Sequence, residues 1–259
     1  MTRVGVCGAA GRMGTEVCRA VAAEDDLVLC AAIDPGAVGR TVADVAGIES
    51  DVVVVGSLDE AGELDVVIDF THLDSARANL AWCAANGVHA VVGTSGFTES
   101  DLDGLRQAFS GSNCVIAPNF AIGAVLMMRF AELAAPHFES AEIIEFHHAG
   151  KLDSPSGTAL STAERMAAAS AEWIDDPTTS ENLEGTRGGV GPAGIPIHAV
   201  RMQGMVAHQE VVLGTTGQTL TIRHDTTDRT SFMPGVIIAV RGVADHEGVN
   251  LGLDSFLGL

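Results

Sequence analysis

The stretch Thr2–Gly14, TRVGVCGAAGRMG, decides the fold of the first half of the chain. A short apolar run ends in glycines at positions 8, 11 and 14, and an amphipathic stretch follows to about residue 23. A strand, a glycine turn and a helix in this order are typical of a dinucleotide site, because glycines let the backbone approach a pyrophosphate at the helix N-terminus. The spacing is G-x-x-G-x-x-G rather than G-x-G-x-x-G, so the prediction also needs support from the residues that follow.

That support comes from the next apolar run, residues 27–33, which predicts a second buried strand. Asp34 follows this run, twenty residues after Gly14. An acidic residue at this place binds a ribose hydroxyl of the adenosine, which favours NAD. Arg12 lies in the glycine turn and offers its charge to a 2′-phosphate instead, which leaves NADP open. We therefore expect both NADH and NADPH as cofactors.

Strands and helices alternate through the first 120 residues. The pattern predicts strands at 52–55, 66–70, 88–92 and 114–117, with helices near 75–86 and 99–109. The predicted fold class is α/β, a Rossmann-type parallel sheet with helices on both faces, followed by a second α+β domain. Because ligands bind at the carboxyl ends of such strands, we expect a nicotinamide pocket walled by Phe70 and Thr71, Gly93, Thr94 and Ser95, and Ala117, Pro118, Asn119 and Phe120.

The character of the sequence changes after Phe120. We expect a methionine-rich packing helix at 122–136, a strand at 141–146, a helix from about 158 to 173, a long loop at 175–194, strands at 196–202, 209–213 and 219–224, a final helix at 231–243 and a short apolar tail at 251–259. The predicted domains are 1–121 plus 230–259 for the dinucleotide, and 122–229 for the substrate and for oligomerisation.

The second domain contains the stretch Glu145–Leu160, EFHHAGKLDSPSGTAL, which carries most of the chemistry. Two adjacent histidines, His147 and His148, precede Lys151, the only lysine in the chain. Every other basic residue is an arginine, so position 151 needs a property that a guanidinium lacks. An ammonium releases a proton when its pKa is lowered, whereas a guanidinium does not. These three residues are therefore candidate proton donors.

The residues that follow, Pro155-Ser156-Gly157-Thr158, predict the first turn of a helix. Free backbone N–H groups at such a turn can bind a carboxylate or a phosphate. We call this turn, residues 155–158, the anion seat, meaning a predicted anion-binding site. Proton donors beside an anion-binding site indicate a site for a small acidic substrate. We predict no metal site, because adjacent histidines on a strand point to opposite faces and cannot easily share one ion.

Composition narrows the classes of partner. The formal net charge of −20 argues against nucleic acid and against an anionic membrane, and no apolar run approaches the ~20 residues of a membrane span. The N-terminus is already part of the first strand and shows no signal sequence. There is no C-x-x-C among the five cysteines, which favours buried free thiols in a reducing, cytoplasmic compartment: Cys7, Cys18, Cys30, Cys83 and Cys114.

Taken together, the segments 142–159 and 8–14 resemble those of the dihydrodipicolinate reductase family, over essentially the whole chain. The resemblance implies NAD(P)H-dependent reduction of 4-hydroxy-tetrahydrodipicolinate to tetrahydrodipicolinate in the diaminopimelate route to lysine. It also implies that the first domain binds NADH or NADPH, that the second binds a cyclic imino dicarboxylate, and that the second domain's sheet assembles a homotetramer.

The same resemblance assigns roles to individual residues. It makes His147 a proton donor or acceptor, Lys151 a proton donor and His148 a substrate contact, and it places one substrate carboxylate on Gly157 and Thr158. It makes the following residues cofactor contacts: Gly8, Ala9, Ala10, Gly11, Arg12, Met13, Asp34, Gly93, Thr94, Ser95, Ala117, Pro118, Asn119 and Phe120. One departure is that the family usually has Gly-Thr-Thr-Gly where this chain has Gly93-Thr94-Ser95-Gly96.

Two alternatives stay open at this point. Another two-domain nicotinamide oxidoreductase, such as an amino-acid or semialdehyde dehydrogenase, predicts no special need for Lys151. A non-catalytic dinucleotide sensor predicts NADH binding without turnover, and it leaves the clustered histidines and the lone lysine unexplained.

Overall fold

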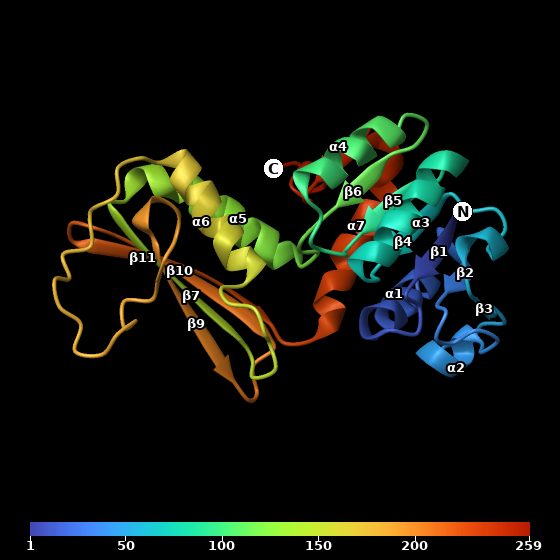
Figure 1. Cartoon of the computed structure of the whole chain (residues 1–259), viewed down its shortest axis with the longest axis horizontal. Helices are drawn as coiled ribbons and strands as arrows, with labels where there is room; N and C mark the ends of the chain where they lie inside the picture. The colour runs from blue at the N-terminus through green and yellow to red at the C-terminus, as the bar shows by residue number, and fades with distance from the viewer. The chain divides into compact units, whose positions relative to one another are not determined.

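The computed structural model describes all residues 1–259, and the chain divides into two compact units. Unit 1 comprises Met1–Phe120 and Phe232–Leu259, and unit 2 comprises Ala121–Ser231. Figure 1 shows the chain by residue number, so that the return of the C-terminal residues to unit 1 can be followed by colour. None of the helices is both long and apolar enough to cross a membrane.

Unit 1 is built on a seven-stranded sheet in the order β12-β6-β5-β4-β1-β2-β3, with every neighbouring pair parallel. The order reverses between β1 and β4, and doubly wound sheets bind their ligands at such a switch point. The strands are β1 (Thr2–Cys7), β2 (Leu27–Ile33), β3 (Val54–Val55), β4 (Val66–Asp69), β5 (His89–Val92), β6 (Cys114–Ile116) and β12 (Val249–Leu251). The α/β prediction is confirmed.

The helices of unit 1 are α1 (Arg12–Ala22), α2 (Val42–Ala46), α3 (Leu73–Asn86), α4 (Glu99–Ala108) and α7 (Met233–Gly242), with 3-10 turns at Leu58–Glu60, Val243–Asp245 and Ser255–Leu257. Because the crossovers are right-handed and the chain runs in opposite directions from the switch point, α1 and α3 lie on opposite faces of the sheet. Helix α1 packs against α7, and α3 packs against α4 (Figure 1). The sheet is therefore covered on both faces.

Unit 2 has a five-stranded mixed sheet in the order β11-β10-β7-β9-β8, in which only β7 and β9 run parallel. Its strands are β7 (Ser140–His148), β8 (Gly189–Val190), β9 (Pro196–Met202), β10 (Ala207–Thr215) and β11 (Gln218–Thr226). Its helices are α5 (Ile122–Ala134) and α6 (Gly157–Ala169), with 3-10 turns at Ala135–His137 and Pro192–Gly194; another, Arg229–Phe232, leads into unit 1. Figure 1 shows α5 and α6 together on one face of this sheet.

The structure corrects several predicted boundaries. Strand β3 has two residues rather than four, and the strand predicted to end at residue 146 continues through His148, because it stays paired with β9 to that point. The helix predicted to reach residue 173 ends at Ala169. Ser170 adopts extended backbone, and its carbonyl accepts a hydrogen bond from the Trp173 indole at 2.9 Å.

Three short helices and strands were not predicted. One is the two-residue strand β8, which lies inside the segment predicted as a loop at 175–194. Helix α2 has five residues, and it is defined by the Thr41–Asp44 capping box and by Gly47 in the left-handed conformation rather than by apolar periodicity. Strand β12 ends at the first residue of the segment predicted as an apolar tail, and it pairs with β6 more than 130 residues earlier in the chain, from Val249 opposite Cys114 to Leu251 opposite Ile116. A strand of three residues is too short to show a pattern of apolar residues, so the sequence around β12 does not predict this pairing.

The glycine turn depends on one close approach between backbones. Gly14 lies in the first turn of α1, and a Cβ there would lie 2.0 Å from the Gly8 carbonyl oxygen and 2.8 Å from the Ala9 Cα. Gly8 itself has φ +77°, a conformation that favours glycine. The helix can therefore start directly on the turn only if both positions lack side chains.

We expect Gly14→Ala to lower the free energy of unfolding by at least about 1–3 kcal/mol, the usual cost of overpacking. The reason is that the backbone at Gly8 and Ala9 must move to make room for the added methyl group. Gly104→Ala is the matched control, since Gly104 lies inside α4 with no heavy atom within 4 Å of an added Cβ. That control should stabilise the protein slightly, by about 0.5–1 kcal/mol. Urea unfolding measures both variants, and equal effects would contradict the close-approach argument.

Candidate active site

A pocket of about 720 Å³ opens in unit 1 at the switch point between β1 and β4. The glycine turn after β1 forms one side, and the residues after β4 form another. The lining residues are Cys7, Gly8, Ala10, Gly11, Arg12, Met13, Ile33, Asp34, Pro35, Gly56, Phe70, Thr71, His72, Ser75, Ala78 and Asn79. The size is in the range of cofactor sites.

The N-terminus of α1 faces this turn and offers donors to an anion. No side chain caps the helix at Gly11, so the N–H groups of its first turn have no capping acceptor. Arg12 is exposed and forms no ion pair, whereas ten of the other twelve arginines bind carboxylates. Unused backbone donors and an unpaired guanidinium fit a bound phosphate or pyrophosphate.

Asp34 fastens the glycine turn to the end of β2. Its Oδ2 accepts a hydrogen bond from the Ala10 N–H at 3.0 Å, and its Oδ1 accepts one from the Gly36 N–H at 3.0 Å. Each oxygen retains acceptor capacity, because a carboxylate oxygen can accept more than one hydrogen bond. The same carboxylate can therefore hold the turn and accept from a ribose hydroxyl.

The ends of β4, β5 and β6 lie side by side, with Asp69 in register with Val92 and Val92 with Ile116. Asp69 is fully buried and joins the loops that follow β4 and β5 to helix α3. It accepts from the Thr71 N–H (3.0 Å) and hydroxyl (2.8 Å), the Thr94 hydroxyl (2.8 Å) and the Asn79 amide (2.7 Å). One carboxylate therefore sets the shape of the loops after β4 and β5.

Aromatic packing extends along the same edge of the sheet. The Phe70 and Phe120 rings lie 5.7 Å apart between centroids, and a Cβ at Gly93 would lie 2.0 Å from the Phe70 ring. Of the predicted cofactor residues, Gly8, Ala10, Gly11, Arg12, Met13, Asp34 and Phe70 line the pocket. Ala9 is buried, and the residues Gly93–Ser95 and Ala117–Phe120 lie at the neighbouring strand ends without lining it.

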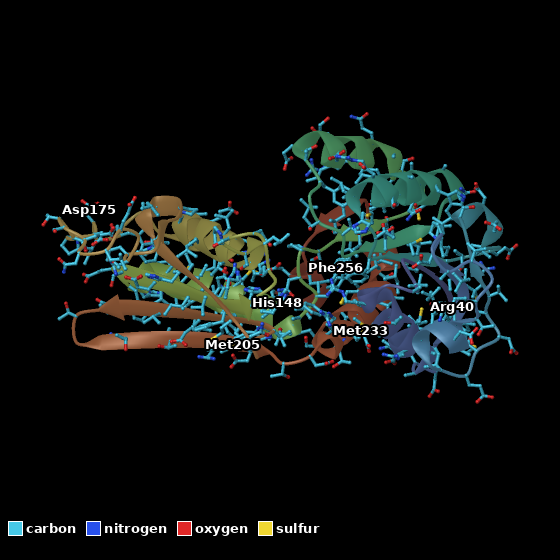
Figure 2. The ribbon with its side chains drawn as sticks, turned by 60° about the horizontal axis from the view of Figure 1, so that its bottom comes forward. Arg40, His148, Asp175, Met205, Met233 and Phe256 are labelled. Atoms are coloured by element: carbon cyan, nitrogen blue, oxygen red, sulfur yellow. The ribbon has the colours of Figure 1, made fainter.

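In unit 2, the strand alternation of β7 separates the two histidines. Glu145 and His147 share one face, and His148 points to the other, where it is exposed. Figure 2 shows His148 and Met205 at the same end of this sheet, where the His148 N–H bonds the Val206 carbonyl. The structure contains no group of three His, Cys, Asp or Glu placed to hold a metal ion.

Glu145 lies at the centre of this end of the unit, with no exposed side-chain surface. Both Arg201 terminal nitrogens donate to it, at 2.7 and 2.8 Å, and the Ser156 N–H donates to it at 3.1 Å. The third partner residue is His147, through its Nδ1. Glu145 therefore connects β7, β9 and the turn before α6.

The predicted anion seat begins α6 as expected. The Ser156 hydroxyl accepts from the Ala159 N–H at 3.2 Å and caps the helix, and Gly157 and Thr158 form its first turn. Lys151 lies in the loop between β7 and α6, and its Nζ donates to both oxygens of Asp153 at 2.8 Å. Asp153 is largely exposed, so this ion pair lies at the open side of the loop.

Burial lowers the pKa of the His147 imidazole. The hydrogen bond to Glu145 and the negative charge of Glu145 raise this pKa, whereas the positive charges of Lys151 and Arg201 lower it further, and the net shift is downward. Burial raises the pKa of Glu145, but the hydrogen bonds from Arg201 and His147 outweigh burial and lower it overall. Glu145 is therefore a carboxylate near neutral pH, and His147 changes its protonation below its usual range.

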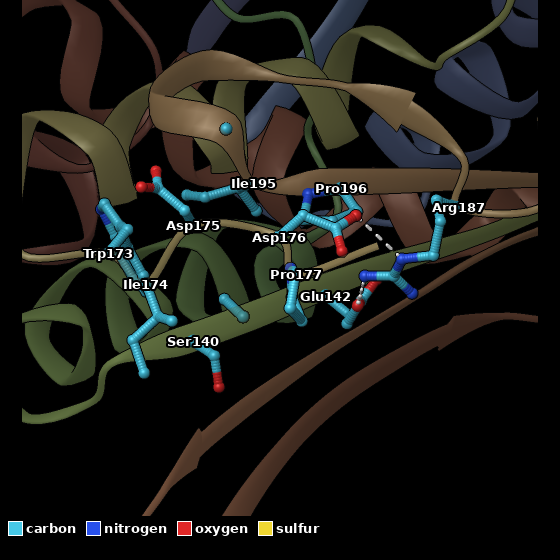
Figure 3. Close-up of a pocket in the computed structure, with 12 residues that line it drawn as sticks. Ser140, Glu142, Trp173, Ile174, Asp175, Asp176, Pro177, Arg187, Ile195 and Pro196 are labelled. Atoms are coloured by element: carbon cyan, nitrogen blue, oxygen red, sulfur yellow. Dashed lines mark hydrogen bonds and ion pairs between the residues drawn. The ribbon is translucent and has the colours of Figure 1, made fainter. Parts of the chain in front are cut away.

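A smaller pocket of about 120 Å³ lies at the other end of β7, near Ser140. Seven residues separate Ser140 from His147, or about 23 Å at a strand rise of ~3.3 Å. Figure 3 shows that Arg187 in this pocket already binds Glu142 and Asp176, at 2.7 and 3.0 Å. With its cation paired, this pocket offers no free charge to an anion.

The chain matches two family models, described as dihydrodipicolinate reductase N-terminus over residues 2–120 and C-terminus over residues 123–257. The chain belongs to the dihydrodipicolinate reductase family. Two 4-hydroxy-tetrahydrodipicolinate reductases are similar to it over the full length of both chains, one from Corynebacterium urealyticum at 48% identity and one from Cutibacterium acnes at 46%.

A solved structure supports the same family. It is a dipicolinate-bound dihydrodipicolinate reductase from Paenisporosarcina sp. TG-14, with 37% identity, a TM-score of 0.83 and coverage of 98% of this chain and 99% of that one. As a member of the dihydrodipicolinate reductase family, the chain is an oxidoreductase of diaminopimelate and lysine biosynthesis, and its Rossmann-type unit implies a nicotinamide cofactor. This sets aside the alternative of a non-catalytic sensor.

Three residues of these sites were not singled out from the sequence: Asp69, Glu145 and Arg201. Two of them left a signal. Asp69 is an acidic residue at the end of a buried strand, and Glu145 stands two residues before His147 on a predicted strand, which places both on one face. Arg201 left none, because its place beside Glu145 depends on the pairing of β7 with β9.

We expect Asp69→Ala to lower the free energy of unfolding by roughly 2–4 kcal/mol, because several buried donors lose their common acceptor. Asp103→Ala is the control, since Asp103 is an exposed acid on α4 paired only with Arg106, and it should change stability by no more than about 0.5 kcal/mol. Urea unfolding compares them. Equal effects would mean that Asp69 does not organise the loops.

Proposed function

We propose that this chain reduces 4-hydroxy-tetrahydrodipicolinate to tetrahydrodipicolinate, with hydride from NADH or NADPH and a proton from the His147 and Lys151 site. The observation that carries the proposal is the cluster at the end of β7. A partly buried histidine backed by a carboxylate, the only lysine and a capped helix N-terminus converge there. The dipicolinate-bound relative from Paenisporosarcina supports a cyclic dicarboxylate as the class of ligand.

The proposed chemistry follows from the substrate's charge. When bound, the reduced nicotinamide supplies a hydride. The substrate first loses its 4-hydroxyl group as water, which gives a conjugated imine. Hydride addition to this imine creates negative charge that a proton must neutralise, so that one hydride and one proton are taken up and one water is released. His147 is only 15% exposed at its side chain and is held at Nδ1, so its Nε2 is the atom that delivers the proton. Lys151 supplies a second positive charge, and a second proton donor, once the substrate displaces Asp153.

A dicarboxylate needs two anion seats. We assign one to Gly157 and Thr158 at the start of α6, where the helix N-terminus favours negative charge. We assign the remaining charge to Lys151, with His148 as a further substrate contact. Charge-assisted hydrogen bonds of this kind are stronger than neutral ones, which suits a small and strongly charged ligand.

For the cofactor, we propose unit 1 as the dinucleotide-binding domain and unit 2 as the substrate domain. Asp34 supports NADH because its oxygens can still accept from ribose hydroxyls. The unpaired Arg12 supports NADPH because it can bind a 2′-phosphate. We therefore propose that both are used, with the contacts predicted from the sequence: Gly8, Ala9, Ala10, Gly11, Arg12, Met13, Asp34, Phe70, Gly93, Thr94, Ser95, Ala117, Pro118, Asn119 and Phe120.

The function is tested by oxidation of NADH and of NADPH, followed by the absorbance of the reduced nicotinamide, with substrate made in situ from pyruvate and aspartate semialdehyde by the preceding synthase. We expect both cofactors to be oxidised only when the complete mixture is present. His147→Ala and Lys151→Ala should each lower turnover by about 100-fold or more, the scale of a general acid. Lys151→Arg should not recover it, because a guanidinium keeps its proton.

The matched control is His137→Ala, which removes an exposed histidine that precedes β7, at the opposite end of this strand from His147, and should leave turnover unchanged. NADH binding, measured by calorimetry, should persist in every variant. Loss of NADH affinity together with turnover would contradict the assignment of His147 and Lys151 to proton transfer.

We also propose that unit 2 assembles a homotetramer through its sheet. Helices cover only one face of this sheet, and the other face carries a row of half-buried apolar side chains that no helix of the unit covers: Ile144, Phe146, Val200 and Val212. Further copies of the same chain would bury this row, and the hydrophobic effect favours that burial.

Light scattering tests the assembly. We expect a mass near four times the 26.6 kDa of one chain, and a smaller species for Val212→Asp, which places a charge on the uncovered face. Val190→Asp, at a 91% exposed position in the edge strand β8, is the matched control and should keep the larger mass. A wild-type protein with the mass of one chain would contradict the proposal.

A further inference from the structure

A fully buried carboxylate stands two residues before the proposed proton donor, and it is neither a proposed proton donor nor part of a proposed anion-binding site. Glu145 has no exposed side-chain surface and yet carries charge, since its partners lower its pKa. Burying a charge is costly unless it is paired and hydrogen-bonded, and a pair of this kind is often no more stable than apolar residues of the same size. Stability alone therefore does not account for this carboxylate.

The partners of Glu145 come from three separate segments. Arg201 on β9 donates both terminal nitrogens, at 2.7 and 2.8 Å, and the same guanidinium also donates to the Asp153 carbonyl at 2.8 Å. Ser156, before α6, donates its backbone N–H at 3.1 Å, and His147 contributes Nδ1 from the strand itself. These contacts hold the carboxylate in one position. The carboxylate in turn holds Arg201, Ser156 and His147 in fixed positions relative to one another.

We propose that Glu145, held by Arg201, is the positioning residue of this active site: it orients the His147 imidazole for proton transfer and holds the Ser156 turn that presents the anion seat. The inference rests on the proposed function, because it gives His147 and the start of α6 the roles assigned there. The inference adds that the Glu145–Arg201 ion pair fixes the position of both His147 and the start of α6.

The effect on His147 has a geometric part and an electrostatic part. A carboxylate at Nδ1 keeps a proton on that nitrogen, which leaves Nε2 as the atom that gains and loses a proton. The groups that act on the imidazole are Glu145 on its own strand, Arg201 on β9 and Lys151 in the loop, while its neighbour on β10 is the uncharged Ala207. The carboxylate favours the imidazolium, and the two cations oppose it.

The effect on the anion seat is positional. The Ser156 N–H is bound to Glu145 and its hydroxyl caps the Ala159 N–H, so both polar groups of the N-cap residue are held from inside the protein. The helix therefore begins at a fixed place relative to His147. A bound carboxylate and the proton donor then keep a constant separation, which is what a proton transfer during reduction requires.

The test is the titration of His147 in the ligand-free protein, followed by NMR and assigned by the signal missing in His147→Gln. Glu145→Gln should lower the His147 pKa by roughly 1–3 units, because an adjacent negative charge is lost and Arg201 remains. Arg201→Met should move it the other way, so that the proton shared by Glu145 and His147 is held to higher pH. The double variant should lie between the two.

Turnover provides the second readout. If imidazolium donates the proton, the rate falls as pH rises through the His147 pKa. That fall should move to lower pH in Glu145→Gln, by the same shift that NMR reports.

Arg187→Met is the matched control, because Arg187 bridges Glu142 and Asp176 at the opposite end of unit 2, the end that Figure 2 marks with Asp175. It should leave the His147 pKa in place.

Two outcomes would overturn the inference. One is an unchanged His147 pKa and pH profile in Glu145→Gln with only a loss of stability, which would make Glu145 structural. The other is an equal shift in Arg187→Met. The proposed function fails separately, and visibly, if wild-type protein does not oxidise NADH or NADPH with the substrate mixture, since the titration needs no substrate.

Discussion

Asp69 in unit 1 and Glu145 in unit 2 are buried carboxylates near the carboxyl ends of strands, and the loops of each unit are arranged around them. A buried carboxylate must find donors for its oxygens, because its transfer from water is otherwise too costly. Asp69 finds them on Thr71, Thr94 and Asn79. Glu145 finds them on Arg201, Ser156 and His147. In both units this requirement brings segments that are distant in sequence to one place.

The distribution of charge follows the same local logic. The chain carries a net charge of −20, yet its relative from Paenisporosarcina binds dipicolinate, a dicarboxylate. Most arginines are already paired with carboxylates and contribute little to a long-range field. What remains for an anion is local: the unpaired Arg12 beside a helix N-terminus, Lys151 against an exposed acid, and the first turn of α6. Short-range donors at helix ends do not need a basic surface.

The sequence indicated the fold correctly where the signal is local. Apolar runs separated by glycine turns predict β1, β2 and the strands after them, and the glycines at 8, 11 and 14 locate the pocket side of the sheet. The elements that were missed or misplaced are those that apolar periodicity does not mark. Helix α2 depends on its caps, β12 on pairing with a distant strand, and the end of α6 on the hydrogen bond between Ser170 and Trp173.

The sequence by itself determined the family and the alternation of strands and helices, and it predicted the groups that we propose to carry the chemistry, since His147, Lys151 and the Gly157–Thr158 turn stand within twelve residues of one another. Only the tertiary structure decided how those groups are held. The pairing of β7 with β9 places Arg201 against Glu145, and the fold of the loop returns Ser156 to the same carboxylate. The physical reason is that a local motif fixes residue types and spacing, whereas the partners of a buried charge come from whichever strands and turns the completed fold places beside it.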